Sequence, residues 1–316
     1  MDWRPYYRTE LEASDARERA ESWLRLAFDA DPVWSPEVGG VVSFPHTAFA
    51  YTGPLDARLV AALYSARVES VVALGVIHSV SLSPIRVALS SQPATAERDR
   101  AFDSAKGGFV LPQSAVDTAY GRLPLRSPDG LASGGLRMLP EEAAASEFSL
   151  DTFLAFLRLG ADVLGKRPVT VLPVYVGMTR RPSDASFDEA VRLADILRDD
   201  VVNVRTAVVA TGDLVHYGTA YGDAEPFIED PSESFRGVLH ETLSAALERE
   251  EFETAYGLCR DVLKSDQREI LPVIANLLEG ATSRIDHFAL SDYTHILKAP
   301  PPCLVASVLA TYHKEH

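Results

Sequence analysis

Three histidines share one context in this sequence, because each comes soon after an apolar run that is typical of a buried β-strand. They are His46, His78 and His216. Strand ends on one edge of a sheet can converge although they are far apart in the chain, and neutral imidazole is a common ligand of iron, zinc and copper. Any one of them taken alone is more simply a loop histidine bonded to backbone. Three in the same context indicate a metal site.

The segment around His46 shows how the chain would position such a group. Residues 41–44 form an apolar run, and Pro45 is expected to end the strand because proline cannot donate to a sheet ladder. His46 then lies just past the carboxyl end of a strand, where ligands bind in open α/β sheets. Residues 55–66 are expected to form an amphipathic helix, with Asp56 on its surface.

Asp213 and His216 form a second pattern, after the apolar run 204–210. A carboxylate three residues before a histidine can reach it if the chain turns helically, and it would then orient the imidazole as a general base. The alternative is that Asp213 caps the following turn of helix. Both interpretations can hold together.

Alternating strand and helix patterns predict an α/β fold, with a mostly parallel or mixed central sheet and helices on both faces. One domain is expected to cover residues 1–316, with a peripheral helical segment in 1–35. Residues 91–137 have little periodicity and read as an irregular excursion. The predicted strands are 41–44, 68–78, 87–89, 169–176 (interrupted by Pro173), 204–210 and 300–309, and the predicted helices are 14–28, 55–66, 151–164, 184–199, 231–248 and 271–278.

Composition excludes several function classes. Acidic residues outnumber basic ones 45 to 30, and the net charge of −15 would repel a phosphate backbone, so nucleic acid is a poor partner. Two cysteines cannot make a disulfide framework, which favours a reducing cytoplasm. The sequence has neither a signal-peptide pattern nor an apolar run long enough to cross a membrane, so we expect neither a signal peptide nor a membrane helix.

Four segments resemble the Memo family, whose bacterial members are called AmmeMemoRadiSam system protein B and whose fold is that of the class III extradiol ring-cleaving dioxygenases. Residues 45–54 are similar to PHAGYxYSGP, and residues 74–78 to LGPxH. Residues 147–151 are similar to EHS(I/L)E, with Phe148 in place of the histidine, and residues 212–218 to SD(L/F)xH(Y/W)G. The resemblance covers roughly residues 39 to 280.

The resemblance implies that His46 and His78 are metal ligands and that Asp213 and His216 line the same pocket, with His216 as the catalytic acid/base. The family usually supplies the third ligand from a cysteine. By simple spacing Ser265 falls at that position, whereas a slip of one residue would put Asp266 there and give two histidines and one carboxylate. Two tyrosines, Tyr51 and Tyr217, are further candidates for the pocket, together with Ser265.

These patterns lead to two hypotheses of different classes. The first is a metal-dependent oxidoreductase of the extradiol type that uses non-haem Fe(II), with zinc or copper as alternatives. The second is a non-catalytic protein that binds a small molecule or a peptide in the same pocket. An accessory role beside a radical enzyme is a third reading, suggested by the family name. We expect no nucleic acid and no membrane as partners, and we leave a homo-oligomer open.

Overall fold

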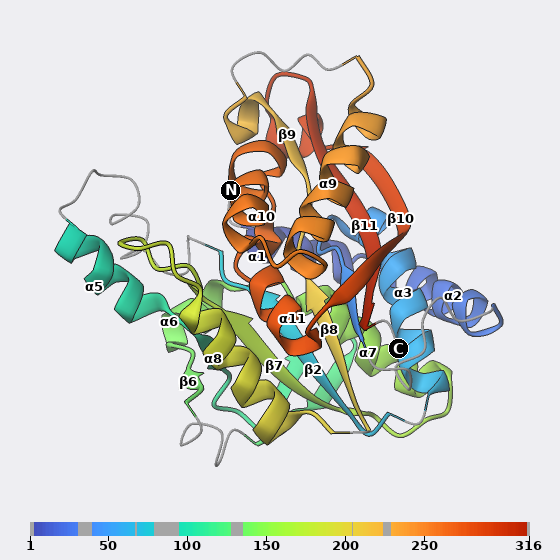
Figure 1. Cartoon of the computed structure of the whole chain (residues 1–316). Helices are drawn as coiled ribbons and strands as arrows, with labels where there is room; N and C mark the ends of the chain where they lie inside the picture. Colours follow the sequence, from blue (N-terminus) through green and yellow to red (C-terminus); the bar gives the residue numbers. More distant parts are fainter. Residues whose placement is uncertain are drawn as a thin grey trace.

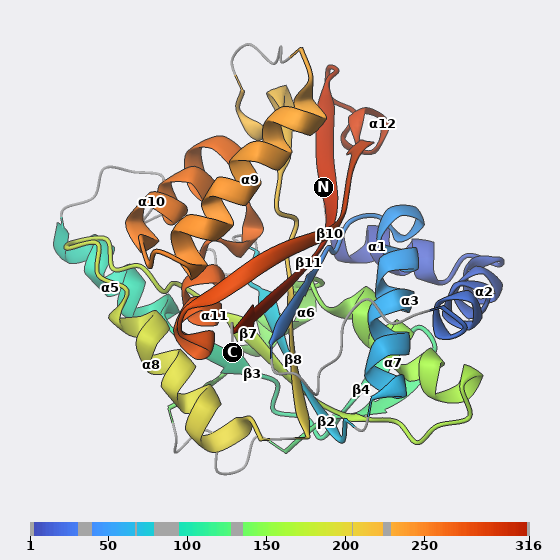
Figure 2. The same ribbon diagram turned by 45° about the vertical axis from the view of Figure 1, so that its right-hand side comes forward.

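The computed structural model describes residues 3–30, 40–66, 68–78, 95–127, 135–203, 205–223 and 229–314 (Figure 1). A nine-stranded mixed sheet runs through the molecule in the order β10-β11-β1-β8-β2-β7-β3-β6, and β9 pairs with β11 beside this path. Helices cover both faces of the sheet (Figure 2). The predicted α/β fold with a covered mixed sheet is therefore confirmed.

Four parallel strands form the centre of the sheet, neighbouring one another in the order β1, β8, β2, β7. Because they are parallel, their carboxyl ends all lie at one edge, which is the edge that the three histidines were predicted to share. Their bounds are Val41–Phe44 for β1, Thr206–Thr211 for β8, Ser70–Val76 for β2 and Thr170–Val176 for β7.

Pro173 does not interrupt β7, contrary to the prediction. The amide of Thr170 donates to the carbonyl of Glu69 on the β2 side. By the alternation of a strand, the nitrogen of Pro173 faces the other neighbour, β3. The β3 ladder ends at Val174, so no donor is needed from position 173 and the strand continues through it.

Antiparallel strands extend the sheet on both sides. The predicted last strand, 300–309, is the longer β11, and the twelve-residue β10 that pairs with it was not predicted. A separate two-stranded sheet is formed by β4 and β5. The bounds are Gly108–Val110 for β3, Ala115–Thr118 for β4, Gly121–Pro124 for β5, Arg137–Met138 for β6, His216–Gly218 for β9, Ala281–Asp292 for β10 and Cys303–Lys314 for β11.

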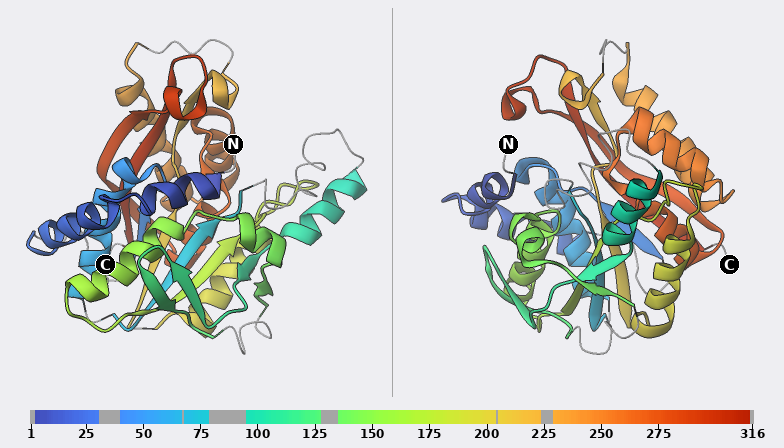
Figure 3. Two further views of the ribbon diagram at one scale, coloured as in Figure 1. Left: turned by 180° about the vertical axis from the view of Figure 1, so that it is seen from behind. Right: turned by 90° about the vertical axis from the view of Figure 1, so that its left-hand side faces the viewer.

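Two helical layers enclose the sheet, each over its own hydrophobic core. One layer contains α8, α9, α10 and α11, and the other contains α2, α3 and α7, which Figure 3 shows from behind. The bounds are Ala16–Phe28 for α2, Phe49–Ser65 for α3, Asp151–Val163 for α7, Asp188–Ile196 for α8, Pro231–Leu247 for α9, Phe252–Gly257 for α10 and Leu271–Leu278 for α11.

Several predicted elements need correction. The excursion 91–137 contains the helix α5, which projects from the body (Figure 1), and strands β3, β4 and β5. Helix α8 starts at Asp188, later than predicted, and a π-helical turn, Leu197–Val201, ends it. The strand predicted at 87–89 lies outside the described residues. The remaining helices are α1 at Trp3–Leu11, α5 at Thr95–Ala105, α6 at Glu141–Ser146 and α12 at Thr294–Leu297.

Helix α3 begins at Phe49, six residues before the predicted start at Leu55, and Pro54 lies inside it. The longer helix turns Asp56 into the core, where it is 1% exposed, so the prediction of a surface position was wrong. The described residues contain no helix that is both long and apolar enough to cross a membrane.

Candidate metal centre

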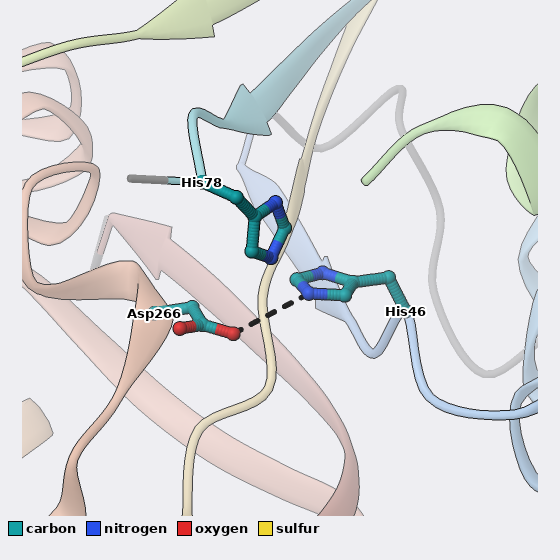
Figure 4. Close-up of side chains that lie close together, drawn as sticks. All are labelled: His46, His78 and Asp266. Atoms are coloured by element: carbon teal, nitrogen blue, oxygen red, sulfur yellow. Dashed lines mark ion pairs between the residues drawn. The ribbon is translucent and has the colours of Figure 1, made fainter. Parts of the chain in front are cut away.

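Three strand ends and one short helix meet at the carboxyl edge of the parallel strands. His46 follows β1 by two residues, His78 follows β2 by two, and Asp213 follows β8 by two. Figure 4 shows His46, His78 and Asp266 turned toward one another. The two imidazole rings lie 5.1 Å apart between centroids, and Nε2 of His46 lies 3.3 Å from Oδ2 of Asp266. One ligand atom from each of the three residues lies within 4.8 Å of the others, close enough to hold one metal ion.

Asp266 reaches the histidines because of the unusual chain path before it. A π-helical turn, Leu258–Leu263, ends at Lys264, whose positive φ of 51° reverses the chain direction. A short 3₁₀ helix, Asp266–Arg268, follows. The side chain of Gln267 ties this helix to the strand ends by donating to the Ser43 hydroxyl at 2.6 Å. The carboxylate of Asp266 is thereby held over the end of β1.

Ser265, the other candidate for the third ligand, does not line the cavity beside the histidines. It caps the 3₁₀ helix, and its hydroxyl accepts a hydrogen bond from the amide of Gln267 at 3.2 Å. A hydroxyl used as a cap and buried at 1% exposure is not available to a metal. Of the two open alternatives, the structure therefore brings Asp266 to the site and leaves Ser265 behind it.

Asp213 and His216 also lie close to Asp266, with one ligand atom from each of these three residues within 4.8 Å of the others. The Nδ1 atom of His216 lies 2.8 Å from the carbonyl of Lys264, and a carbonyl only accepts, so Nδ1 carries the proton and Nε2 keeps its lone pair. That Nε2 lies 3.7 Å from Oδ2 of Asp266 and 3.9 Å from Oδ2 of Asp213. These distances place His216 beside the first group of ligands with its basic nitrogen inward.

The carboxylate of Asp213 joins the two groups. Its Oδ1 accepts the backbone amide of His46 at 3.0 Å, and its Oδ2 lies 3.9 Å from Nε2 of the same histidine. The alternative that Asp213 caps a helix was wrong, since residues 212–215 are irregular and β9 follows them. Asp213 instead fixes the loop that carries His46.

Glu147, to which the sequence assigned no role, orients His78. Its Oε1 accepts a hydrogen bond from Nδ1 of His78 at 3.0 Å and from the backbone amides of Phe148 and Ser149 at 2.8 and 2.9 Å. Its Oε2 accepts a hydrogen bond from the backbone amide of His78 at 2.9 Å. A carboxylate on Nδ1 leaves Nε2 of His78 free to bind a metal. The ring of Phe148 stacks on that of His78 at 4.2 Å. The signal in the sequence was the similarity of residues 147–151 to a family motif, which did not say what Glu147 does.

The charges of this buried cluster perturb its pKa values. Burial works against the charged form of His46, but Asp213 and Asp266 outweigh it and raise the pKa of His46 to about 9. Burial also opposes ionisation of Asp266, but His216, His46 and His78 hold the pKa of Asp266 below its usual range. Burial raises the pKa of Asp213. Burial also opposes ionisation of Glu147, yet His78 and the backbone amides lower the pKa of Glu147 to about 2.

A cavity of about 220 Å³ opens onto these groups, and one of its walls is aromatic. Helix α1 supplies part of that wall through Trp3 and Tyr7, so this helix, which was predicted to lie in a peripheral segment, contributes to the cavity. Tyr7 stacks on Phe148 at 5.1 Å, which joins α1 to the ring that contacts His78. The described lining residues are Trp3, Tyr7, His46, His78, Phe148, Asp213, His216, Tyr221, Lys264, Asp266, Tyr293 and Val305.

The three further pocket candidates do not line this cavity. Ser265 serves as the cap described above. Tyr51 is exposed on α3, with its ring 6.0 Å from that of Tyr293. Tyr217 points to the opposite face of the sheet from the histidines, as strand alternation requires, and packs on Phe235 at 5.0 Å. These three predictions for the pocket were wrong.

The donor set fits a divalent transition metal. Two imidazoles, which are neutral once they bind a metal, and one carboxylate suit iron, zinc and copper, and they leave coordination positions for other ligands. Metal-binding histidines usually hydrogen-bond through the ring nitrogen that does not bind the metal. Glu147 is this partner for Nδ1 of His78, and the hydroxyl of Thr211, 3.2 Å from Nδ1 of His46, has the same role for His46. The buried His and Asp groups can therefore hold a metal ion.

Neither the scan against protein-family models nor the search of curated proteins finds a match for this chain.

Proposed function

We propose that the protein is a metal-dependent oxidoreductase, with non-haem Fe(II) held by His46, His78 and Asp266. The observation that carries the proposal is the convergence of these three side chains, with ligand atoms within 4.8 Å of one another, in the lining of a cavity. Two histidines and one carboxylate are the ligands of many non-haem iron oxygenases. The proposal agrees with the resemblance of the four motifs to the Memo family and to extradiol dioxygenases.

Fe(II) bound there would supply adjacent positions for dioxygen and an electron-rich substrate, so that electrons can pass between them. The rest of the work falls to the side chains of this protein. Glu147 keeps Nε2 of His78 directed into the cavity through its contact with Nδ1. Asp213 holds the His46 loop by its hydrogen bond to the amide of that residue.

His216 is the residue placed to move a proton. Its Nε2 faces the cavity with a free lone pair, because Nδ1 donates to the carbonyl of Lys264. It can take a proton from a substrate hydroxyl at Nε2 and return it to the product. Asp213, with Oδ2 3.9 Å from that nitrogen, stabilises the imidazolium that forms in between.

The cavity selects for a flat substrate. A volume of about 220 Å³ exceeds the roughly 150 Å³ that accommodates benzene in an engineered protein cavity, so one substituted ring fits. Phe148, Tyr221 and Tyr293 give this ring aromatic surfaces to pack on. The ring would lie with its oxygen substituents toward the histidines, and the aromatic wall would exclude water from them.

The experiment is oxygen consumption by protein loaded with Fe(II) under anaerobic conditions and then mixed with a panel of catechols and other electron-rich phenols. We expect uptake by the wild type, no uptake by His46→Ala, which loses the iron, and strongly reduced uptake by His216→Ala, which keeps it. His240→Ala on the exposed face of α9 is the matched control and should behave as the wild type. Iron-loaded wild type that binds a phenol without consuming oxygen would instead favour a non-catalytic binding protein.

A further inference from the structure

The metal centre contains a second set of ligands that the proposed function does not use as ligands. Asp213, His216 and Asp266 also bring one ligand atom each within 4.8 Å of one another, as His46, His78 and Asp266 do. Asp266 belongs to both sets. We propose that Asp213, His216 and Asp266 hold a second divalent transition-metal ion beside the first, with the Asp266 carboxylate shared between the two ions.

Three contacts arrange the second set of ligands for an ion. The carbonyl of Lys264 fixes the tautomer of His216 at 2.8 Å, so Nε2 is free to coordinate. The amide of Asp266 donates to the carbonyl of Asp213 at 3.0 Å, which holds the two acidic residues side by side. Oδ2 of Asp266 lies 3.3 Å from Nε2 of His46 and 3.7 Å from Nε2 of His216, between the two histidines. The Asp266 carboxylate is therefore within reach of both imidazoles, as a ligand that bridges two ions must be.

The charges near the cavity leave room for a second cation. Among the described residues that line it, Lys264 is the one basic side chain of the Lys and Arg type, and its ammonium is paired with Asp223 at 2.6 Å. Asp223 therefore offsets the charge of this ammonium. The second set has one histidine where the first has two, and it shares its carboxylate, so we expect its affinity for zinc to be at least about tenfold lower.

Filling the second site would have a defined consequence, which rests on the proposed function. The ion would coordinate Nε2 of His216, the atom that moves the proton. Metal in excess of one equivalent would then stop the reaction while the first ion stays in place. Binding itself does not depend on that function and can be measured without a substrate.

The test is equilibrium dialysis of the full-length, metal-free protein against Zn²⁺, with bound zinc measured by mass spectrometry. We expect two zinc ions per chain in the wild type and in the control His240→Gln. His216→Gln should bind one, the tighter, and His46→Ala should lose the tighter one. Circular dichroism and thermal unfolding of each metal-free variant show whether it is folded.

Each outcome separates the two proposals. Saturation of the wild type at one zinc, lost in His46→Ala and kept in His216→Gln, would overturn the second site and leave the first intact. One zinc that is lost in His216→Gln but kept in His46→Ala would overturn the proposed function. Electron paramagnetic resonance of the wild type with two equivalents of Mn²⁺ needs no variant. An exchange-coupled pair supports the shared carboxylate, and two isolated ions contradict it.

Discussion

Replacing Glu147 by glutamine removes the negative charge that orients His78 while keeping the shape of the side chain. In the wild type, Oε1 accepts three hydrogen bonds and Oε2 accepts one, from the amide of His78. A glutamine that keeps its oxygen in the place of Oε1 must direct its NH₂ group at the amide of His78. Two donors then face each other at about the 2.9 Å that separates donor and acceptor now. If the glutamine amide is turned over, its NH₂ group takes the place of Oε1 and faces the three donors that now bond to that oxygen, which is less favourable still.

The cost follows from the pKa of Glu147, which is lowered from 4.5 to about 2. Multiplied by 1.36 kcal/mol for each pH unit, this difference means that ionised Glu147 contributes about 3 kcal/mol to stability at neutral pH. The carboxyl is 2% exposed, so solvent screens it little. Because the folded pKa is the lower one, this stability is present above about pH 4.5 and is lost as the pH falls toward 2. We expect Glu147→Gln to destabilise the fold by about 3 kcal/mol and to weaken metal binding about 10- to 100-fold.

Urea unfolding at neutral pH and again near pH 3 measures the first effect, and a metal titration measures the second. The difference between variant and wild type should shrink at the lower pH, as the wild-type carboxylate approaches its own pKa. Glu142→Gln, an exposed acidic residue on α6, is the matched control and should change neither quantity. A Glu147→Gln protein with wild-type stability and wild-type metal affinity would refute the role given to this carboxylate.

Two further substitutions test the fold around the site. Asp56 is buried with Oδ1 unpartnered, and burial raises the pKa of its carboxyl well above 3.8, so it weakens the fold as pH rises. Asp56→Asn should therefore be more stable than the wild type by about 1 kcal/mol or more in urea at pH 8, with the advantage gone near pH 4. Gly218 follows His216 in β9 at φ +119°, and an added Cβ would lie 2.0 Å from the Pro302 carbonyl. Gly218→Ala should cost about 3 kcal/mol in thermal unfolding.

Both substitutions have outcomes that would count against these expectations. An Asp56→Asn protein less stable than the wild type at pH 8 would mean that the carboxyl is ionised and paired in the core. Gly237→Ala on α9 is the control for the glycine, since nothing lies within 4 Å of its added Cβ. It should stabilise the protein by about 0.5–1 kcal/mol. Equal effects of the two alanines would show that β9 does not approach Pro302 as described.

The histidines could be predicted because local sequence determines their positions. An apolar run places β1, Pro45 closes it, and His46 must then lie at the strand end, where parallel pairing with β8 brings Asp213 close. The same logic applies to His78 at the end of β2. These positions follow from strand patterns alone, without knowledge of what packs around them.

The identity of the third ligand could not be decided from spacing, because the conformation of a short turn determines which side chain faces the histidines. Lys264 adopts a left-handed conformation, and Gln267 ties the next turn to Ser43, far away in the sequence. No pattern within the segment reports either contact. Whether Ser265 or Asp266 faces the histidines depends on both.

Elements held by tertiary packing were missed for a similar reason. Among the described strands, β10 pairs with β11 alone, and its mostly half-buried, polar-rich sequence lacks the apolar run by which the other strands were found. Helix α1 is short and polar, with Tyr7 and Leu11 as its buried residues. Its place over the cavity is set by the stacking of Tyr7 on Phe148, from another part of the chain.

The most direct test of the metal centre is a crystal of the protein soaked anaerobically with Fe(II), with anomalous scattering recorded on both sides of the iron edge. The structure predicts an iron peak bonded to Nε2 of His46, Nε2 of His78 and the carboxylate of Asp266. A peak elsewhere, or imidazoles of His46 and His78 that bind nothing in common at saturating iron, would contradict the proposed centre.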